Sequence, residues 1–402
     1  MPAKHPAKAR FPCDECPVTE FRFLHTADLH LGRRFGALPE DLRGRLVEAR
    51  HALLPNLAQA AARFGAGHIL LAGDTFDSET PSDPVWRQAL VAMGAAPDLH
   101  WWIIPGNHDS LAAESLWTRL AQHAPANVHL LTEARPVQIA PGVTLLPCPL
   151  PRRYPGRDLT AWMAEAETPP GQVRIGLAHG AIRDFSSDGS GADGIIPPDR
   201  AATARLDYLA LGDWHGRIEV NPRTFYPGTP ERDAAHPDAR GTCLAVTLPA
   251  PGALPVVETL STGRFHWTED RLALLPGQDA AALLANRLPA DRPARRDQLL
   301  RLRVTGRATL SERAVLAEAV AAAAPDFALL DLDLAALDTD VEAADLDEID
   351  RAGALRLAAE RLRAAAEDPA RAEGDRRISA AALNRLFGYL REDRAWDWFP
   401  SP

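Results

Sequence analysis

Short apolar runs recur along the first two thirds of the chain, and polar residues follow each of them before a stretch with helical spacing begins. The runs with the length and composition of buried strands are 21–26, 68–72, 99–104, 143–146, 173–178 and 208–211. Residues 42–64 and 85–93 instead carry apolar side chains at helical spacing, and Pro55 interrupts the first of these stretches. Strands that alternate with helices predict an α/β domain with a layered sheet.

The pattern changes beyond the last of these strands. Residues 298–304 and 327–334 alternate between apolar and polar positions as strands do, and an alanine-rich helix separates them. Thr309 and Glu312 form a capping-box pair at the start of that helix. We therefore predict a small α/β cap domain over residues 266–340.

The C-terminal part of the chain differs in composition and in the spacing of its apolar residues. Residues 331–350 contain nine acidic residues and no basic one, which indicates a solvated acidic linker. Residues 351–367 and 379–390 have the spacing of amphipathic helices, and Ser379 is the expected N-cap of the second. We predict an acidic linker and helical tail over residues 341–402.

The composition limits the classes of protein. The chain has 402 residues, enough for two or three domains, and 44 Lys plus Arg against 54 Asp plus Glu give a net charge of −10. This argues against a protein that holds nucleic acid by bulk charge alone, but not against one that holds a polyanion locally with metal ions or a few arginines. The chain has neither a membrane-length apolar run nor a signal-peptide core, so we expect a cytoplasmic protein that makes no membrane contact.

The four cysteines are too few for a disulfide scaffold. Cys13 and Cys16 form a C-x-x-C, but Cys148 and Cys243 are isolated, so a four-cysteine zinc site lacks its second pair. We interpret residues 1–20, which are rich in proline, as an irregular N-terminal extension.

Polar clusters at the strand ends are the most informative feature of the sequence. They are Asp28-Leu29-His30, Gly73-Asp74, Gly106-Asn107-His108-Asp109, His179-Gly180 and Gly212-Asp213-Trp214-His215. Each cluster follows an apolar run, so each is expected where a strand delivers its last residue to a sheet edge. Aspartate, asparagine and histidine are nitrogen and oxygen ligands that suit Mn²⁺, Fe, Zn²⁺ or Mg²⁺, and the clusters are numerous enough for two metal ions.

The order of these clusters resembles that of the calcineurin-like metallophosphoesterases, and within them the SbcD-type DNA repair exonucleases. Residues 25–32 (HTADLHLG), 207–212 (DYLALG) and 226–231 (YPGTPE) are similar to segments of that branch. The resemblance covers residues 21–265 and implies a metallophosphoesterase β-sandwich flanked by helices. For residues 266–340 the resemblance implies a cap domain without matching motifs, and the last 60 residues lie outside it.

The resemblance also implies a role for each candidate residue. The first metal ion would be held by Asp28, His30 and His215, the second by Asn107 and His179, with Asp74 bridging the two ions. His108 would act as general acid or charge stabiliser, oriented by Asp109, since an imidazole titrates near neutral pH.

One position departs from the family pattern. The last motif of the family is usually G-H-x-H, whereas this chain has Gly212-Asp213-Trp214-His215. A carboxylate at Asp213 makes the site harder and more negative, which favours Mn²⁺ or Mg²⁺ over softer ions. The alternative is a weakened or lost second site. Arg33 and Arg34 follow the first motif and either contact substrate phosphate or remain solvated.

The expected function is metal-dependent hydrolysis of phosphodiesters, most specifically by a DNA exonuclease that acts in repair. Two alternatives remain open: a phosphodiesterase of cyclic nucleotides or other small nucleotides, and a regulatory subunit whose site has decayed. The family resemblance further implies a homodimer and an SbcC-like coiled-coil ATPase as partner.

Overall fold

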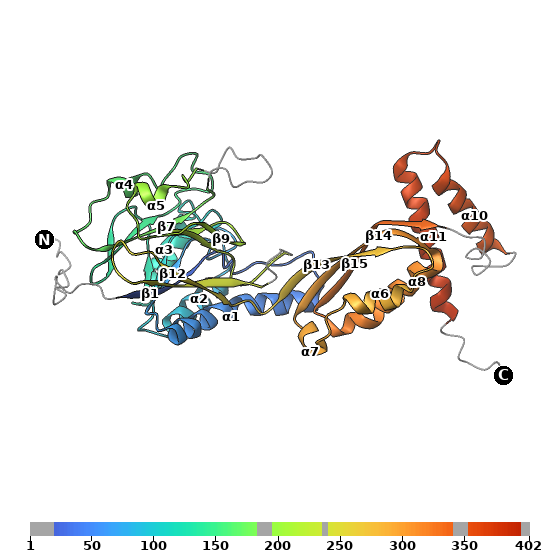
Figure 1. The fold of residues 1–402 in the computed structure, drawn as a ribbon, viewed down its shortest axis with the longest axis horizontal. Helices are drawn as coiled ribbons and strands as arrows, with labels where there is room; N and C mark the ends of the chain where they lie inside the picture. The colour runs from blue at the N-terminus through green and yellow to red at the C-terminus, as the bar shows by residue number, and fades with distance from the viewer. Residues whose placement is uncertain (1–19, 183–194, 235–239, 341–352, 395–402) are drawn as a thin grey trace. The chain divides into compact units, whose positions relative to one another are not determined.

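The computed structural model describes residues 20–182, 195–234, 240–340 and 353–394. The chain divides into two compact units, residues 1–266 and 267–402 (Figure 1). The second unit contains the segment predicted as a cap domain together with two helices of the predicted tail, and the separation of these parts at residue 340 stays a prediction. The predicted N-terminal extension, with Cys13 and Cys16, lies outside the described residues, except for Glu20.

The first sheet of the first unit has the strand order β12-β11-β1-β2-β3-β4. Its strands are β1 (Phe21–Thr26), β2 (His68–Leu71), β3 (His100–Ile103), β4 (Val128–Leu130), β11 (Thr242–Leu248) and β12 (Val256–Ser261). β1 to β4 run parallel, while β11 pairs antiparallel with both β1 and β12. The carboxyl ends of β1, β2 and β3 therefore meet at one edge of this sheet.

The second sheet has the order β5-β6-β7-β8-β10-β9. Its strands are β5 (Val137–Ala140), β6 (Val143–Cys148), β7 (Val173–His179), β8 (Tyr208–Gly212), β9 (Arg217–Asn221) and β10 (Thr224–Pro227). β6, β7 and β8 are parallel neighbours. These three strands are buried along their whole length, as the continuous apolar runs of the sequence predicted.

The two sheets pack face to face around a core that includes Phe23, Leu70, Leu177 and Tyr208. The outer faces are covered by helices, and Figure 1 shows α1 and α2 on one side of the unit and α4 and α5 on the other. The helices are α1 (Glu40–Phe64), α2 (Asp83–Gly94) and α3 (Glu114–His123) on the first sheet, and α4 (Trp162–Glu165) and α5 (Arg200–Thr203) on the second. The prediction of an α/β sandwich flanked by helices is confirmed.

Helix α1 continues through Pro55, where the sequence predicted an interruption. Its apolar stripe, which includes Leu53, Leu54 and Leu57, is buried against the first sheet. This packing holds the helix together across the missing backbone donor of proline. Gly65 ends the helix in the left-handed region, with φ of 73°.

The second unit contains a three-stranded sheet of order β13-β14-β15. The sheet and its helices are β13 (His266–Leu274), β14 (Gln298–Thr309), β15 (Leu329–Asp340), α6 (Ala280–Arg287), α7 (Arg292–Arg295), α8 (Leu310–Ala323) and the 3-10 turn η1 (Ala324–Asp326). The capping box predicted at Thr309 and Glu312 is confirmed. Leu302, Val304 and Leu316 lie in the core of this sheet and its helices.

Part of the predicted acidic linker is instead a strand, because residues up to Asp340 belong to β15. β15 runs parallel to β14, with Asp331 opposite Arg301 and Asp333 opposite Arg303. The nearest nitrogen–oxygen distances are 2.8 Å for the first pair and 3.7 Å for the second. These two acidic residues therefore face basic partners across the strand pair, and residues 341–350 of the acidic segment lie outside the described residues.

The tail contains the helices α10 (Ala354–Glu367) and α11 (Glu373–Arg394). The prediction that Ser379 caps the second helix is wrong, because α11 begins six residues earlier. The Ser379 hydroxyl donates a hydrogen bond to the carbonyl of Asp375 at 2.9 Å, one turn back in the same helix.

Candidate metal centre

The polar clusters predicted at the strand ends come together where the two sheets present their carboxyl ends. Asp28 follows β1, Asp74 follows β2, and Asn107 and His108 follow β3. His179 is the last residue of β7, opposite Gly212 at the end of β8. Backbone hydrogen bonds join the loops, for example from the N–H of Asp28 to the carbonyl of Gly73 at 3.1 Å.

A first group of ligand atoms consists of Asp28, His30 and His215, which lie within 4.8 Å of one another. The Nε2 atoms of His30 and His215 are 3.2 Å apart. Asp28 and His30 are buried, whereas His215 is half-buried. One carboxylate and two imidazoles at these separations form a ligand set for a divalent transition metal ion.

A second group shares Asp28 with the first and adds Asp74 and His179, again within 4.8 Å. The Oδ2 atom of Asp74 lies 3.7 Å from Nε2 of His30 and 3.6 Å from Nε2 of His179. A single carboxylate oxygen thus stands between a histidine of each group, which is the position that a bridging ligand requires.

Two buried atoms show that these residues suit a cation. The Nδ1 atom of His179 lies 2.7 Å from the carbonyl of Ala72, so Nδ1 keeps its proton and Nε2 is the nitrogen that can bind a metal ion once it is deprotonated. Nε2 of His179 and Oδ1 of Asn107 are buried and have no hydrogen-bond partner among the described residues. Buried polar atoms without a partner are costly, and a metal ion bound to both atoms would satisfy them.

Asp213, the residue that departs from the family pattern, lies within this group. Its Oδ1 atom is 3.7 Å from Nε2 of His179 and accepts a hydrogen bond from Nδ2 of Asn107 at 3.0 Å. Its backbone N–H points to both carboxylate oxygens of Asp28, at 3.2 and 3.1 Å. A direct metal contact by Asp213 stays a prediction, and the geometry also gives it the task of orienting Asn107.

His108 is held beside the same groups. Its backbone N–H donates to Oδ1 of Asp74 at 2.8 Å, and its Nδ1 lies 3.0 Å from the carbonyl of Asp77. The rings of His30 and His108 meet edge to face with centroids 4.8 Å apart. The proton of His108 is thereby placed on Nδ1, and the other ring nitrogen stays available for proton exchange.

Asp109 has a different task from the one expected. Its two carboxylate oxygens accept backbone N–H groups of Gly106, at 2.7 Å, and Phe76, at 3.1 Å. The carbonyl of Asp77, rather than Asp109, is the partner of the His108 ring. Asp109 therefore ties together the loops after β2 and β3, and burial beside Asp74 raises its pKa to about 7.

Three residues that support the ligands were missed in the sequence. Oδ1 of Asp77 lies 3.2 Å from Nδ1 of His30, and Oδ1 of Asp233 lies 3.4 Å from Nδ1 of His215. Carboxylates in this position fix the ring orientation of metal-ligating histidines. The third, the buried Arg50 of α1, donates to the carbonyl of Leu29 at 2.6 Å. The signals available were the short distance in sequence from Asp74 to Asp77 and the acidic residue just after the 226–231 segment.

Arg33 is engaged with these supporting carboxylates. Its guanidinium lies 2.9 Å from Asp233 and 3.7 Å from Asp77. Arg34, by contrast, is exposed. The structure thus gives Arg33 a local electrostatic role, while phosphate contacts by either arginine stay predictions.

Burial and mutual repulsion perturb the charges of the centre. Burial raises the pKa of Asp28 to about 7. Burial lowers the pKa of His179, but the carboxylates of Asp74, Asp28 and Asp213 more than reverse this and raise it to about 9. Without a cation the centre therefore retains protons near neutral pH, and a bound cation replaces them.

The backbone at the centre is unusual. Four non-glycine residues have positive φ there: Asp28 at 56°, His30 at 45°, Asp74 at 53° and Asp213 at 100°. The loops also approach closely, since a Cβ atom at Gly106 would lie 2.1 Å from Oδ1 of Asp74. Both features indicate that the backbone here adopts conformations that these residues disfavour, because the positions of the site's side chains require them.

A family model described as calcineurin-like phosphoesterase matches residues 21–217. This segment is a calcineurin-like metallophosphoesterase domain. Proteins of this family use a dimetal centre, in line with the two ligand groups that share Asp28.

Two relatives align with the metallophosphoesterase domain. The uncharacterized metallophosphoesterase YhaO of Bacillus subtilis (strain 168) is 30% identical over 226 residues, which cover 52% of this chain and 53% of YhaO. The SbcD component of the SbcCD nuclease of Escherichia coli (strain K12) is 27% identical over 194 residues, which cover 46% of this chain and 40% of SbcD. The chain thus spans about half or less of the length of these relatives.

Solved structures also resemble part of the chain. A crystal structure of a Thermus thermophilus protein aligns with 61% of this chain and all of its own chain at 12% identity, with a TM-score of 0.38. A dimetal phosphatase from Danio rerio aligns with the same shares at 12% identity, with a TM-score of 0.33.

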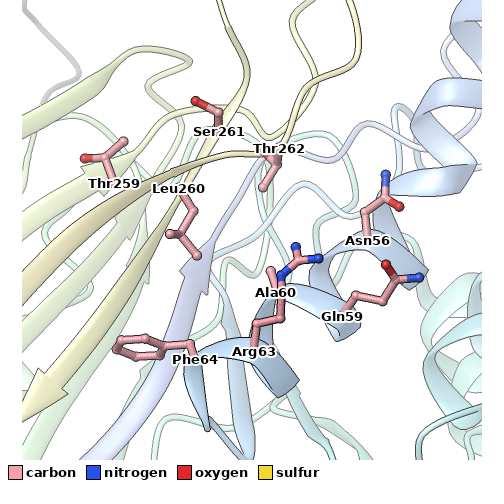
Figure 2. A pocket seen from close by; sticks show the side chains of 9 residues that line it. All are labelled: Asn56, Gln59, Ala60, Arg63, Phe64, Thr259, Leu260, Ser261 and Thr262. Atoms are coloured by element: carbon pink, nitrogen blue, oxygen red, sulfur yellow. The ribbon is translucent and has the colours of Figure 1, made fainter.

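The metallophosphoesterase domain also has a groove of about 560 Å³ between α1 and the edge strand β12. Figure 2 shows Asn56, Gln59 and Arg63 of the helix facing the end of the strand and Thr262. None of the candidate metal ligands lines this groove, so it is separate from the metal centre. Among the described residues, no helix is both long and apolar enough to cross a membrane.

Proposed function

We propose that the chain is a metal-dependent phosphodiesterase that acts on DNA as an exonuclease in repair. The observation that supports this most directly is the pair of ligand groups that share Asp28, with one oxygen of Asp74 between His30 and His179. The similarity to a protein named as a subunit of a nuclease supports the choice of a nucleic acid as substrate, and DNA is the nucleic acid we propose.

Asp28, His30 and His215 would hold one cation, Asn107 and His179 the other, with Asp213 beside the second and Asp74 bridging. Bound divalent cations supply Lewis acidity toward phosphoryl oxygens and lower the pKa of a coordinated water. Three carboxylates and an amide make the donor set rich in oxygen, so Mn²⁺ or Mg²⁺ is the expected choice over Fe or Zn²⁺.

His108 is the expected proton donor to the leaving oxygen. Its Nδ1 is occupied by the Asp77 carbonyl, so the other ring nitrogen is the one that exchanges a proton with substrate. Asp77 thus fixes the tautomer, and Asp74 fixes the backbone of His108 through its N–H.

The partners of this activity are part of the same proposal. Similarity to a protein named as a subunit of a nuclease supports homodimerisation and an SbcC-like ATPase partner, and a cytoplasmic location is proposed beside them. The metal centre itself lies entirely within the first unit.

End-labelled duplex DNA with Mn²⁺ tests the proposal, beside hydrolysis of bis-p-nitrophenyl phosphate. We expect metal-dependent shortening of the DNA, and Asn107→Ala and His108→Ala should each reduce the rate at least about 100-fold, a loss typical of a catalytic group. His123→Ala, at the end of α3, is the control and should retain full activity.

Hydrolysis of the small diester without shortening of the DNA would contradict the exonuclease proposal and favour a phosphodiesterase of small nucleotides. Inactivity on both substrates, with metal bound, would overturn the proposal and favour a regulatory subunit with a decayed site.

A further inference from the structure

One loop of the first unit, residues 151–157 (PRRYPGR), is basic, aromatic and exposed. It contains three arginines and one tyrosine and no acidic residue. Arg152, Arg153 and Arg157 are exposed, and the exposed fraction of Tyr154 is 66%. In a chain with a net charge of −10, this is a local concentration of positive charge.

The loop leaves the second sheet beside the metal centre. β6 and β7 run parallel, with Cys148 opposite Ala178, the residue before His179. Since Cys148 ends β6, the chain enters the loop at the level of His179 and at the same edge of the sheet.

Backbone hydrogen bonds also join the start of the loop to the segment that carries Asn107 and His108. The N–H of Leu150 lies 3.5 Å from the carbonyl of Pro105, and the carbonyl of Leu150 accepts the N–H of Leu111 at 2.9 Å. The loop therefore begins one residue after Leu150, whose two backbone hydrogen bonds reach residues on either side of His108, the proposed proton donor.

The arginines of the loop are available to a ligand. Within the described residues, Arg152, Arg153 and Arg157 form no ion pair, since the adjacent Asp158 pairs with Arg200. Arg33, nearer the ligands, is instead committed to Asp233.

Local contacts define the conformation of the loop. Arg152 donates to the carbonyl of Pro155 at 3.3 Å, and Gly156 adopts a positive φ of 68°. The guanidinium of Arg153 lies 5.6 Å from the centroid of the Tyr154 ring. A cation and an exposed aromatic face are thus presented together.

This combination has a specific ligand chemistry. Guanidinium groups match phosphate oxygens in geometry and charge, and an exposed aromatic ring stacks on a nucleobase. Stacking requires a base that is free of its partner strand, whereas the phosphates of a duplex need no aromatic contact.

We propose that residues 151–157 bind a single strand of nucleic acid, with Arg153 and Arg157 at successive phosphates and Tyr154 against one base. The loop then holds the strand so that its phosphodiester lies at the metal centre. This inference rests on the proposed function, because it names the form in which the substrate reaches the site.

The test is binding of a fluorescent oligothymidylate of about 12 nucleotides, a length within the usual site size of a single-strand binder, to the full-length protein in EDTA. Fluorescence anisotropy follows the binding, so that no cleavage is needed. The variant Arg153→Ala/Arg157→Ala leaves the Arg152–Pro155 hydrogen bond in place. Its matched control is Arg22→Ala/Arg63→Ala, which removes the same charge from the start of β1 and the end of α1. Tyr154→Ala tests the stacking contact separately.

We expect the loop variant to bind about tenfold or more weakly at low salt and to lose roughly 1.4 from the slope of log K against log salt, as for two phosphates of a single strand. Tyr154→Ala should weaken binding about tenfold with an unchanged salt slope. The control should bind as the wild type does.

Equal binding by the loop variant and the control overturns the proposal, as does a wild-type protein that does not bind the strand. If Tyr154→Ala binds the strand with wild-type affinity, Tyr154 makes no contact with a base, and the single-strand assignment is overturned. Failure of the proposed function is detected by a separate measurement: the wild type would then be inactive on bis-p-nitrophenyl phosphate with Mn²⁺.

Discussion

Each candidate histidine ligand is oriented by a contact to its second ring nitrogen. His30 faces Asp77 and His215 faces Asp233, whereas His179 uses the carbonyl of Ala72. The difference matters because a carboxylate carries a negative charge and stabilises an imidazolium more strongly than a neutral carbonyl does. The acidity of His179 is instead set by the carboxylates that would share its metal ion.

The affinity for Mn²⁺ should rise with pH between about 7 and 8.5. The raised pKa of His179, about 9, means that the free protein carries a proton that the metal must displace. One displaced proton gives up to about tenfold in affinity per pH unit. Titration calorimetry in buffers of different ionisation enthalpy measures the released protons, and His179→Gln should abolish that part of the release. A wild-type affinity that is flat across this range would contradict the prediction.

At the scale of the elements, the sequence was most informative where a local pattern determines the structure. The apolar runs before Asp28, Asp74 and His179 located strand ends, and parallel pairing then brought these residues together. Partners distant in sequence were not predictable in this way. The ion pair of Asp331 with Arg301 of β14 is seen only once the two strands lie side by side, and Asp233 is recognisable only once His215 lies beside it.

Three histidines on neighbouring strands of the first sheet form a separate stacked cluster. His68 accepts the indole N–H of Trp102 at 3.1 Å, and Nδ1 of His100 lies 3.0 Å from Nε2 of His129. The Trp102 and His129 rings stack with centroids 3.9 Å apart. Burial, with the nearby His100 and His129, lowers the pKa of His68 to about 4.

This cluster should make the fold sensitive to acid. Because the pKa of His68 is lowered from 6.5, the unfolded chain takes up a proton that the folded chain refuses, and stability falls as the pH falls from 6.5 to about 4. His68→Asn keeps an acceptor for Trp102 and should reduce this loss by roughly 1–3 kcal/mol. Urea unfolding at about pH 7 and about pH 4.5 measures it, with His123→Asn as control. Identical pH dependence in wild type and variant would contradict the prediction.

At the scale of the whole molecule, chemistry and charge are unevenly distributed. All candidate ligands lie in the first unit, and each unit has its own apolar core. A metal ion that binds only the folded first unit stabilises that unit by mass action and leaves the second without a direct gain.

Calorimetric unfolding of the full chain should therefore show two transitions, only one of which responds to Mn²⁺. At a free concentration of about 100 times Kd, the responsive transition should rise by roughly 5–10 °C. Asp74→Asn should cancel the shift and leave the other transition in place. Equal shifts of both transitions, or a shift that survives in Asp74→Asn, would refute this assignment.

The left-handed backbone at Asp28, Asp74 and Asp213 has a consequence for how such a protein changes over generations. Each of these residues costs of order 1–3 kcal/mol in a conformation that glycine adopts freely. Aspartate and glycine codons differ by a single base, so the stabilising replacement is always one mutation away. A lineage selected for stability alone would lose these carboxylates, and only continued selection for the chemistry keeps them.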